Sequence, residues 1–100
     1  MKTVRNLQKT TSEVSGSIKI TIDKEGTELT IKKCLLDSLN LAKKVTALEA
    51  VRAWDLYKKL KEYTEDSIDI DDQDKELLLR VIEERDYIVP IKAALAQSIG

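Results

Sequence analysis

The chain has 100 residues, of which 42% are hydrophobic and 35% are charged, so it is long enough for one domain with one small core. Lys and Arg total 17 and Asp and Glu total 18, and the resulting net charge of −1 disfavours a nucleic-acid-binding protein. The sequence has no His and a single Cys, which removes the usual metal ligand, the commonest general base and any internal disulfide.

The first residues, 1–16, show no helical or strand periodicity, and Lys2, Arg5 and Lys9 make them mildly basic. We interpret 1–16 as a mobile N-terminal arm that precedes a single domain over 17–100. The arm lacks the apolar stretch of a signal peptide, and no run in the chain reaches the length of a membrane span. We therefore expect a cytoplasmic protein that has no contact with a membrane.

A strand pattern follows the arm. Ile18, Ile20 and Ile22 alternate with polar residues, and a polar loop then ends at Gly26, which can adopt the positive φ that hairpin turns require. The alternation resumes after this loop and predicts a β-hairpin over 17–31. Two strands alone are marginally stable, so the isoleucine face must cover helices or pair with another chain.

The rest of the chain has the periodicity of helices. Thr30 can cap a helix that runs to about Ala42, and Thr46 can cap a longer one that runs to about Tyr63, where Glu49 completes a possible capping box. A third helix begins at Asp71 or Asp72. A last helix over about 91–99 follows Pro90, which is favoured at the first helical position. The sequence therefore predicts an α+β fold, in which an N-terminal β-hairpin precedes a small bundle of three to four α-helices.

The helix over 46–63 has an unusually wide apolar face. When residues are placed 100° apart around the helix axis, the apolar side chains cover about 200° of its circumference. The apolar stripe of an ordinary surface helix is a little over 100° wide. Either this helix is central to the bundle, or half of its apolar face meets a partner. The face comprises Ala47, Ala50, Ala53, Trp54, Leu56, Tyr57, Leu60 and Tyr63.

The residues offer little for catalysis or metal binding. Cys34 lies in an apolar helical stripe without a His to activate it, and we assign it a structural role. An EF-hand loop that began at Asp69 would have Asp74 in place of its Gly and Arg80 in place of its final Glu. The Gly residues are too isolated for a phosphate-binding loop. We predict no enzyme activity, no cofactor and no metal.

Three segments together resemble small accessory proteins encoded by tailed bacteriophages and prophages. They are GTELTIKKCLLDSL at 26–39, ALEAVRAWDL at 47–56 and IDIDDQDKELL at 68–78. The resemblance covers about residues 18–100 and consists of helix caps and core positions, without a catalytic residue to transfer. It implies a phage or prophage setting in the cytoplasm of a host bacterium, and it implies no reaction.

We therefore expect a non-enzymatic protein that associates with itself and acts by binding a host or phage protein. The predicted interface residues are aromatic or aliphatic, and comprise Trp54, Tyr57, Leu60, Leu56, Ile18 and Ile20. One alternative is an oligomer that sequesters an anionic host nucleotide or signalling metabolite. The candidate ligand-binding residues for this function are Lys32, Lys33, Arg52 and Lys58. A second alternative is a component of virion assembly.

Overall fold

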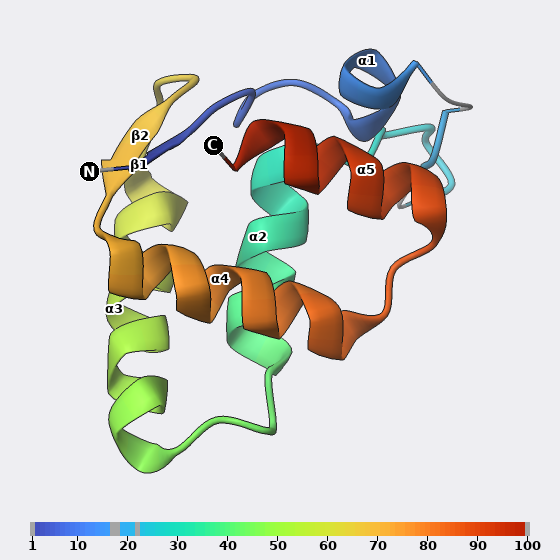
Figure 1. Ribbon diagram of the computed structural model, residues 1–100. Helices are drawn as coiled ribbons and strands as arrows, with labels where there is room; N and C mark the ends of the chain where they lie inside the picture. Colours follow the sequence, from blue (N-terminus) through green and yellow to red (C-terminus); the bar gives the residue numbers. More distant parts are fainter. Residues whose placement is uncertain (1, 17–18, 22, 100) are drawn as a thin grey trace.

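The computed structural model describes residues 2–16, 19–21 and 23–99 (Figure 1). Ile18 and Ile22, two of the residues on which the predicted hairpin depends, lie outside these ranges. The elements in chain order are β1 (Lys2–Val4), α1 (Thr11–Ser15), α2 (Ile31–Leu41), α3 (Ala47–Glu62), β2 (Ile68–Ile70), α4 (Asp72–Arg85) and α5 (Val89–Ser98).

The sheet joins two segments that are far apart in the sequence. β1 pairs antiparallel with β2, with Lys2 opposite Ile70 and Val4 opposite Ile68. Val4 also forms an isolated bridge with Ile99, so the first strand lies between β2 and the end of α5. The α+β class is confirmed, and the two strands lie at Lys2–Val4 and Ile68–Ile70 instead of in the described part of 17–31.

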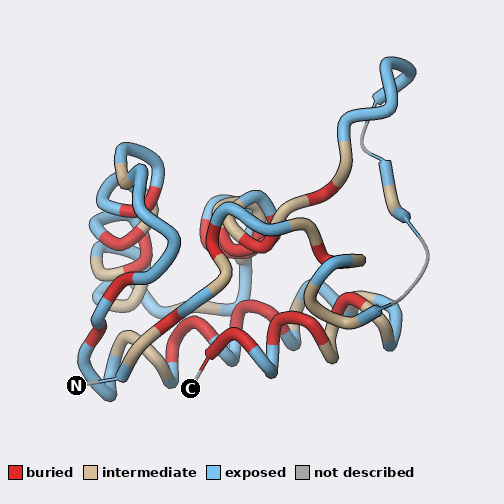
Figure 2. Tube along the Cα trace, turned by 90° about the horizontal axis from the view of Figure 1, so that it is seen from above, coloured by how far each residue is buried: buried red, intermediate tan, exposed pale blue. Residues whose placement is uncertain are grey.

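The described part of 17–31 keeps the predicted reversal of the chain and contains no regular strand. Thr21 and Glu28 form an isolated antiparallel bridge, and the Leu29 N–H donates to the Ile20 carbonyl at 2.8 Å. Gly26 has the expected positive φ, of 85°. Residues 23–27 are exposed and stand away from the helices (Figure 2), whereas Ile20 is partly buried against the core. A short hairpin whose turn packs against no other element gains too little from burial to extend its ladder.

The prediction of a mobile N-terminal arm is also corrected, because residues 2–16 belong to the domain. The side chains of Val4 and Leu7 are buried in the core. The Leu7 N–H donates to the Asp66 carbonyl at 2.8 Å, and the Leu7 carbonyl accepts from the Lys32 N–H at 3.1 Å. Short apolar stretches without periodicity can thus be ordered by partners more than 20 residues away.

The predicted helix starts are confirmed for α2, α3 and α4. Thr30, Thr46 and Asp71 each accept a hydrogen bond from the backbone N–H three residues ahead. Such a cap satisfies one of the N–H groups that a helix leaves unpaired. Pro90 stands in the first turn of α5, as its fixed φ favours. α1 was not predicted, because its five residues are too few to show a period.

The core lies between α2 and the elements around it. α2 packs against α3 and α4, while α1 packs against α5. Figure 2 shows the buried residues on the sides of the elements that face one another. No helix in the described ranges is long and apolar enough to cross a membrane.

Candidate interaction surface

The start and rotation of α3 are fixed by its cap and by contacts to α4. Thr46 and Glu49 form the predicted capping box, with Glu49 N–H donating to Thr46 Oγ1 at 3.2 Å and Thr46 N–H donating to Glu49 Oε1 at 2.9 Å. Glu49 also pairs with Arg80 of α4. These contacts decide which side of α3 faces the protein and which side faces solvent.

The inward side of α3 is part of the core. Ala53, Leu56 and Leu60 are all buried there. Two of the predicted interface residues, Leu56 and Leu60, are therefore core residues that a partner cannot reach without unfolding the helix from its neighbours. The wide apolar face is divided between the core and the solvent. That a partner covers its exposed part stays a prediction.

The opposite side of α3 carries three exposed apolar side chains. Leu48 is 84% exposed, Val51 is 63% exposed and Trp54 is 50% exposed. They follow one another at intervals of three, so they form an oblique row that turns about 60° around the helix at each step and continues to Tyr57, which is partly buried against the core. We call these four residues the outer α3 surface. Leu48 and Val51 were missed by the sequence analysis, and their signal was the presence of two large apolar residues beside Arg52 and Asp55.

The aromatic end of this surface is pre-ordered. The rings of Trp54 and Tyr57 are stacked, with centroids 4.9 Å apart and an interplanar angle of 7°. Lys61 Nζ lies 5.8 Å from the centre of the Tyr57 ring. Together with Lys58 and Glu62, these residues line a shallow hollow of about 430 Å³. Stacked rings lose little further freedom on binding, which suits an anchoring site.

A second hollow of about 410 Å³ lies beside Leu48 and Val51. Its remaining walls are Arg52, Asp55, Leu56, Lys59 and Asp74. The two hollows lie along the outer α3 surface, and side chains of another molecule can pack into them.

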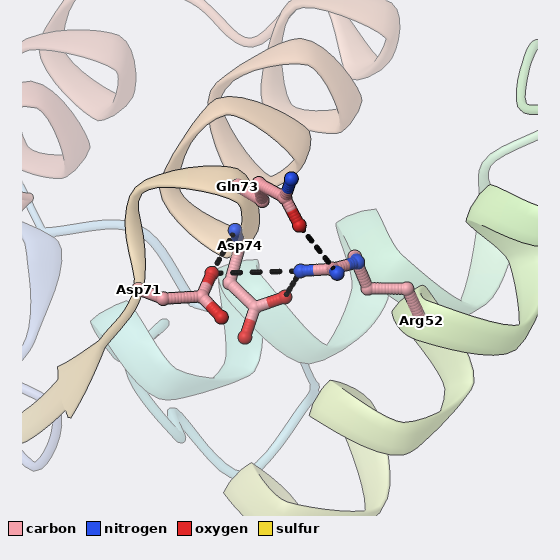
Figure 3. Close-up of polar contacts among 4 residues, drawn as sticks. All are labelled: Arg52, Asp71, Gln73 and Asp74. Atoms are coloured by element: carbon pink, nitrogen blue, oxygen red, sulfur yellow. Dashed lines mark hydrogen bonds and ion pairs between the residues drawn. The ribbon is translucent and has the colours of Figure 1, made fainter.

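Arg52 is the link between this surface and α4 (Figure 3). Its Nη1 lies 2.9 Å from Asp74 Oδ1 and 3.5 Å from Asp71 Oδ1, while its Nη2 donates to Gln73 Oε1 at 2.6 Å. Asp71 is also the cap of α4 and accepts from the Asp74 N–H at 2.7 Å. The guanidinium is thus satisfied by groups of its own chain, and it holds α3 against the start of α4.

The other predicted ligand residues lie in separate contacts. Lys32 Nζ donates to the carbonyl of Tyr63, Lys33 pairs with Asp37 at 3.1 Å, and Lys58 pairs with Asp55 at 3.7 Å. Lys32 and Lys33 belong to α2, whereas Arg52 and Lys58 belong to α3. The structure brings the four into no shared contact.

The predicted interface residues of the hairpin do not join α3. Ile18 lies outside the described residues. Ile20 is partly buried against the core. The described portion of the hairpin therefore forms a feature separate from the outer α3 surface.

Reactive groups are few in the described part of the chain. Burial raises the pKa of the Cys34 thiol to about 12, so the thiol is protonated at neutral pH and is a poor nucleophile. No group of three or more Cys, Asp or Glu side chains is placed to hold a metal ion among the described residues.

No protein-family model, no curated protein and no solved structure matches this chain.

Proposed function

We propose that this protein acts without catalysis, by binding protein surfaces, and that it associates with itself through the outer α3 surface. The observation that carries the proposal is the exposure of Leu48, Val51 and Trp54 in one row on one helix. Contiguous apolar patches are uncommon on soluble monomers and mark sites where another molecule binds.

The physical gain comes from removing these side chains from water. Each Å² of apolar surface that is covered contributes about 25 cal/mol before the costs of association are subtracted. Trp and Tyr are enriched among the residues that dominate binding energies, and Trp54 and Tyr57 are already stacked. The capping box and the Arg52 contacts hold α3 in place, so little ordering remains to be done on binding.

The alternatives draw on other features. An anion-binding oligomer needs several cations around one ligand, and Lys32, Lys33, Arg52 and Lys58 each contact a different group of the protein. This arrangement favours protein binding. The resemblance to tailed-phage proteins supports an accessory role in the cytoplasm of an infected or lysogenic host. Detection of the protein in purified phage particles would instead indicate a role in virion assembly.

The test is the solution mass, measured by light scattering after size exclusion over a roughly hundredfold range of concentration. We expect a mass above the 11.3 kDa of one chain for the wild type, and a mass of one chain for the double variant Leu48→Gln, Val51→Gln. Gln is a good helix former, so α3 is preserved in this variant. The matched control is Leu41→Gln, Leu79→Gln, which removes two other exposed leucines and should associate like the wild type.

Two results would contradict the proposal. One is a wild type that keeps the mass of one chain at every concentration. The other is an oligomer whose mass does not change in the Leu48→Gln, Val51→Gln variant. A thermal shift on adding nucleotides would support the metabolite-binding alternative.

A further inference from the structure

A second exposed apolar group lies where α4 turns into α5. Ile88 is 57% exposed and Val89 is 79% exposed, and Pro90 stiffens the chain directly after them. With the nearby Glu83 and Asp86 we call this group the α4–α5 corner. In the described ranges, the large apolar side chains that are at least half exposed are Ile88 and Val89 of the corner and Leu48, Val51 and Trp54 of α3.

The corner carries exposed negative charge. The side chains of Glu83 and Asp86 are 73% and 89% exposed. Both lie near Lys92 Nζ, at 3.6 and 3.4 Å, but ion pairs between groups this exposed are weak and leave the carboxylates available. Arg85, which lies between them in sequence, places its guanidinium over the ring of Tyr87.

The end of the outer α3 surface carries the opposite charge. Lys58, Lys59 and Lys61 stand in the last turns of α3, and they outnumber the two carboxylates beside them, Glu62 and Asp55, of which Asp55 lies 3.7 Å from Lys58. Lys58 and Lys61 line the hollow at Trp54, and Lys59 lines the hollow at Val51. An apolar row that ends in lysines is complementary to an apolar pair flanked by carboxylates.

A parallel symmetric contact between two α3 helices is disfavoured by these same charges. It would place Lys58 beside its own counterpart. Like charges in direct opposition destabilise an interface, so a surface of opposite charge is the better occupant.

We propose that the outer α3 surface is covered by the α4–α5 corner of a second copy of this chain. The inference rests on the proposed function and names its contact. Ile88 and Val89 cover the apolar row of α3, and Glu83 and Asp86 lie beside the lysines that end it. Figure 1 places α3 and the connection from α4 to α5 on opposite sides of the molecule, so one copy cannot satisfy both of its own surfaces.

A contact between two different surfaces is head-to-tail. Each copy that is bound through its α3 surface still presents a corner, and another copy can add to it. The contact therefore generates a ring if the rotation between copies closes, and an open chain if it does not. A symmetric dimer is not produced by this contact.

The test uses two variants that each lose one surface. Leu48→Gln, Val51→Gln removes the α3 side, and Ile88→Ser, Val89→Gln removes the corner, where Ser is itself a favoured helix cap. We expect each variant alone to have the mass of one chain, because each lacks one half of the contact. We expect their mixture to form a complex of one copy of each, since the intact corner of the first meets the intact α3 surface of the second.

The outcomes separate the contact from the function that it serves. If the corner variant still associates by itself while the α3 variant does not, the proposed function stands and the head-to-tail contact is overturned. If both variants associate like the wild type, the α3 surface is not the interface and the proposed function fails as well. A wild type that stays a single chain overturns both.

A charge variant gives an independent readout. Glu83→Gln, Asp86→Asn keeps both side chains close in size, and Asn tolerates the left-handed backbone of residue 86. We expect association to weaken about tenfold and to lose most of its dependence on salt concentration. Glu25→Gln, Glu76→Gln is the matched control and should behave like the wild type. Unchanged affinity and salt dependence in the Glu83→Gln, Asp86→Asn variant would overturn the inference.

Discussion

The carboxylate of Glu84 in α4 accepts a hydrogen bond of 2.6 Å from the backbone N–H of Lys43, in the connection between α2 and α3. Its second oxygen accepts from the Lys44 N–H at 3.2 Å. Glu49 holds the other end of the same connection, through the N–H of Thr46. The α2–α3 connection is thus held by two carboxylates.

These contacts predict a loss of stability in acid. The hydrogen bond from the Lys43 N–H lowers the pKa of Glu84, and the one from Thr46 lowers the pKa of Glu49. A lowered folded-state pKa gives stability above the unfolded value of about 4.3, and this stability is lost as the pH falls through the folded value. Denaturation midpoints measured across this range should fall less steeply in Glu49→Gln, Glu84→Gln than in the wild type. Equal slopes would contradict the prediction.

The N-terminal segment should matter for stability. Leu7 is fully buried, so Leu7→Ala should lower the free energy of unfolding by about 2–5 kcal/mol. The neighbouring Lys9 is exposed, and Lys9→Ala should change it by no more than about 0.5 kcal/mol. Denaturant titration of both variants is the measurement. A Leu7→Ala variant as stable as the Lys9→Ala control would restore the interpretation of a mobile arm.

The two sides of α3 should respond differently to truncation. Leu60 is 1% exposed, and Leu60→Ala should cost about 2–5 kcal/mol of stability. Trp54→Ala should cost about 1 kcal/mol or less, because half of the side chain already faces water, yet it should weaken association by about 2 kcal/mol. Unfolding and solution mass are measured on the same samples. A Trp54→Ala variant that unfolds as readily as Leu60→Ala would place Trp54 in the core.

The thiol of Cys34 should be unreactive in the folded protein. It is fully buried and its pKa is raised to about 12, mainly by burial, so very little thiolate exists at pH 8. Labelling with an aromatic disulfide should be slow in buffer and fast in denaturant. The exposed variant Gln97→Cys is the matched control and should react quickly with one added thiol. Rapid labelling of Cys34 in buffer would contradict its burial.

Much of the helical structure was determined by short-range signals in the sequence. Thr30, Thr46 and Asp71 each act on an N–H three residues ahead, and Pro90 acts on its own φ. These effects need no distant partner, so the sequence was sufficient to predict where α2, α3 and α4 begin. The left-handed conformation of Gly26 is local in the same sense.

The tertiary structure alone decided the rest, because the contacts concerned join residues far apart in the chain. β1 is a strand because residues 68–70 and Ile99 lie beside it, and Leu7 is core because Asp66 and Lys32 hold its backbone. The same holds for the candidate site. The sequence indicated a wide apolar face on one helix, but only the packing of α3 against α2 and α4 assigned Leu56 and Leu60 to the core and left Leu48, Val51 and Trp54 in water.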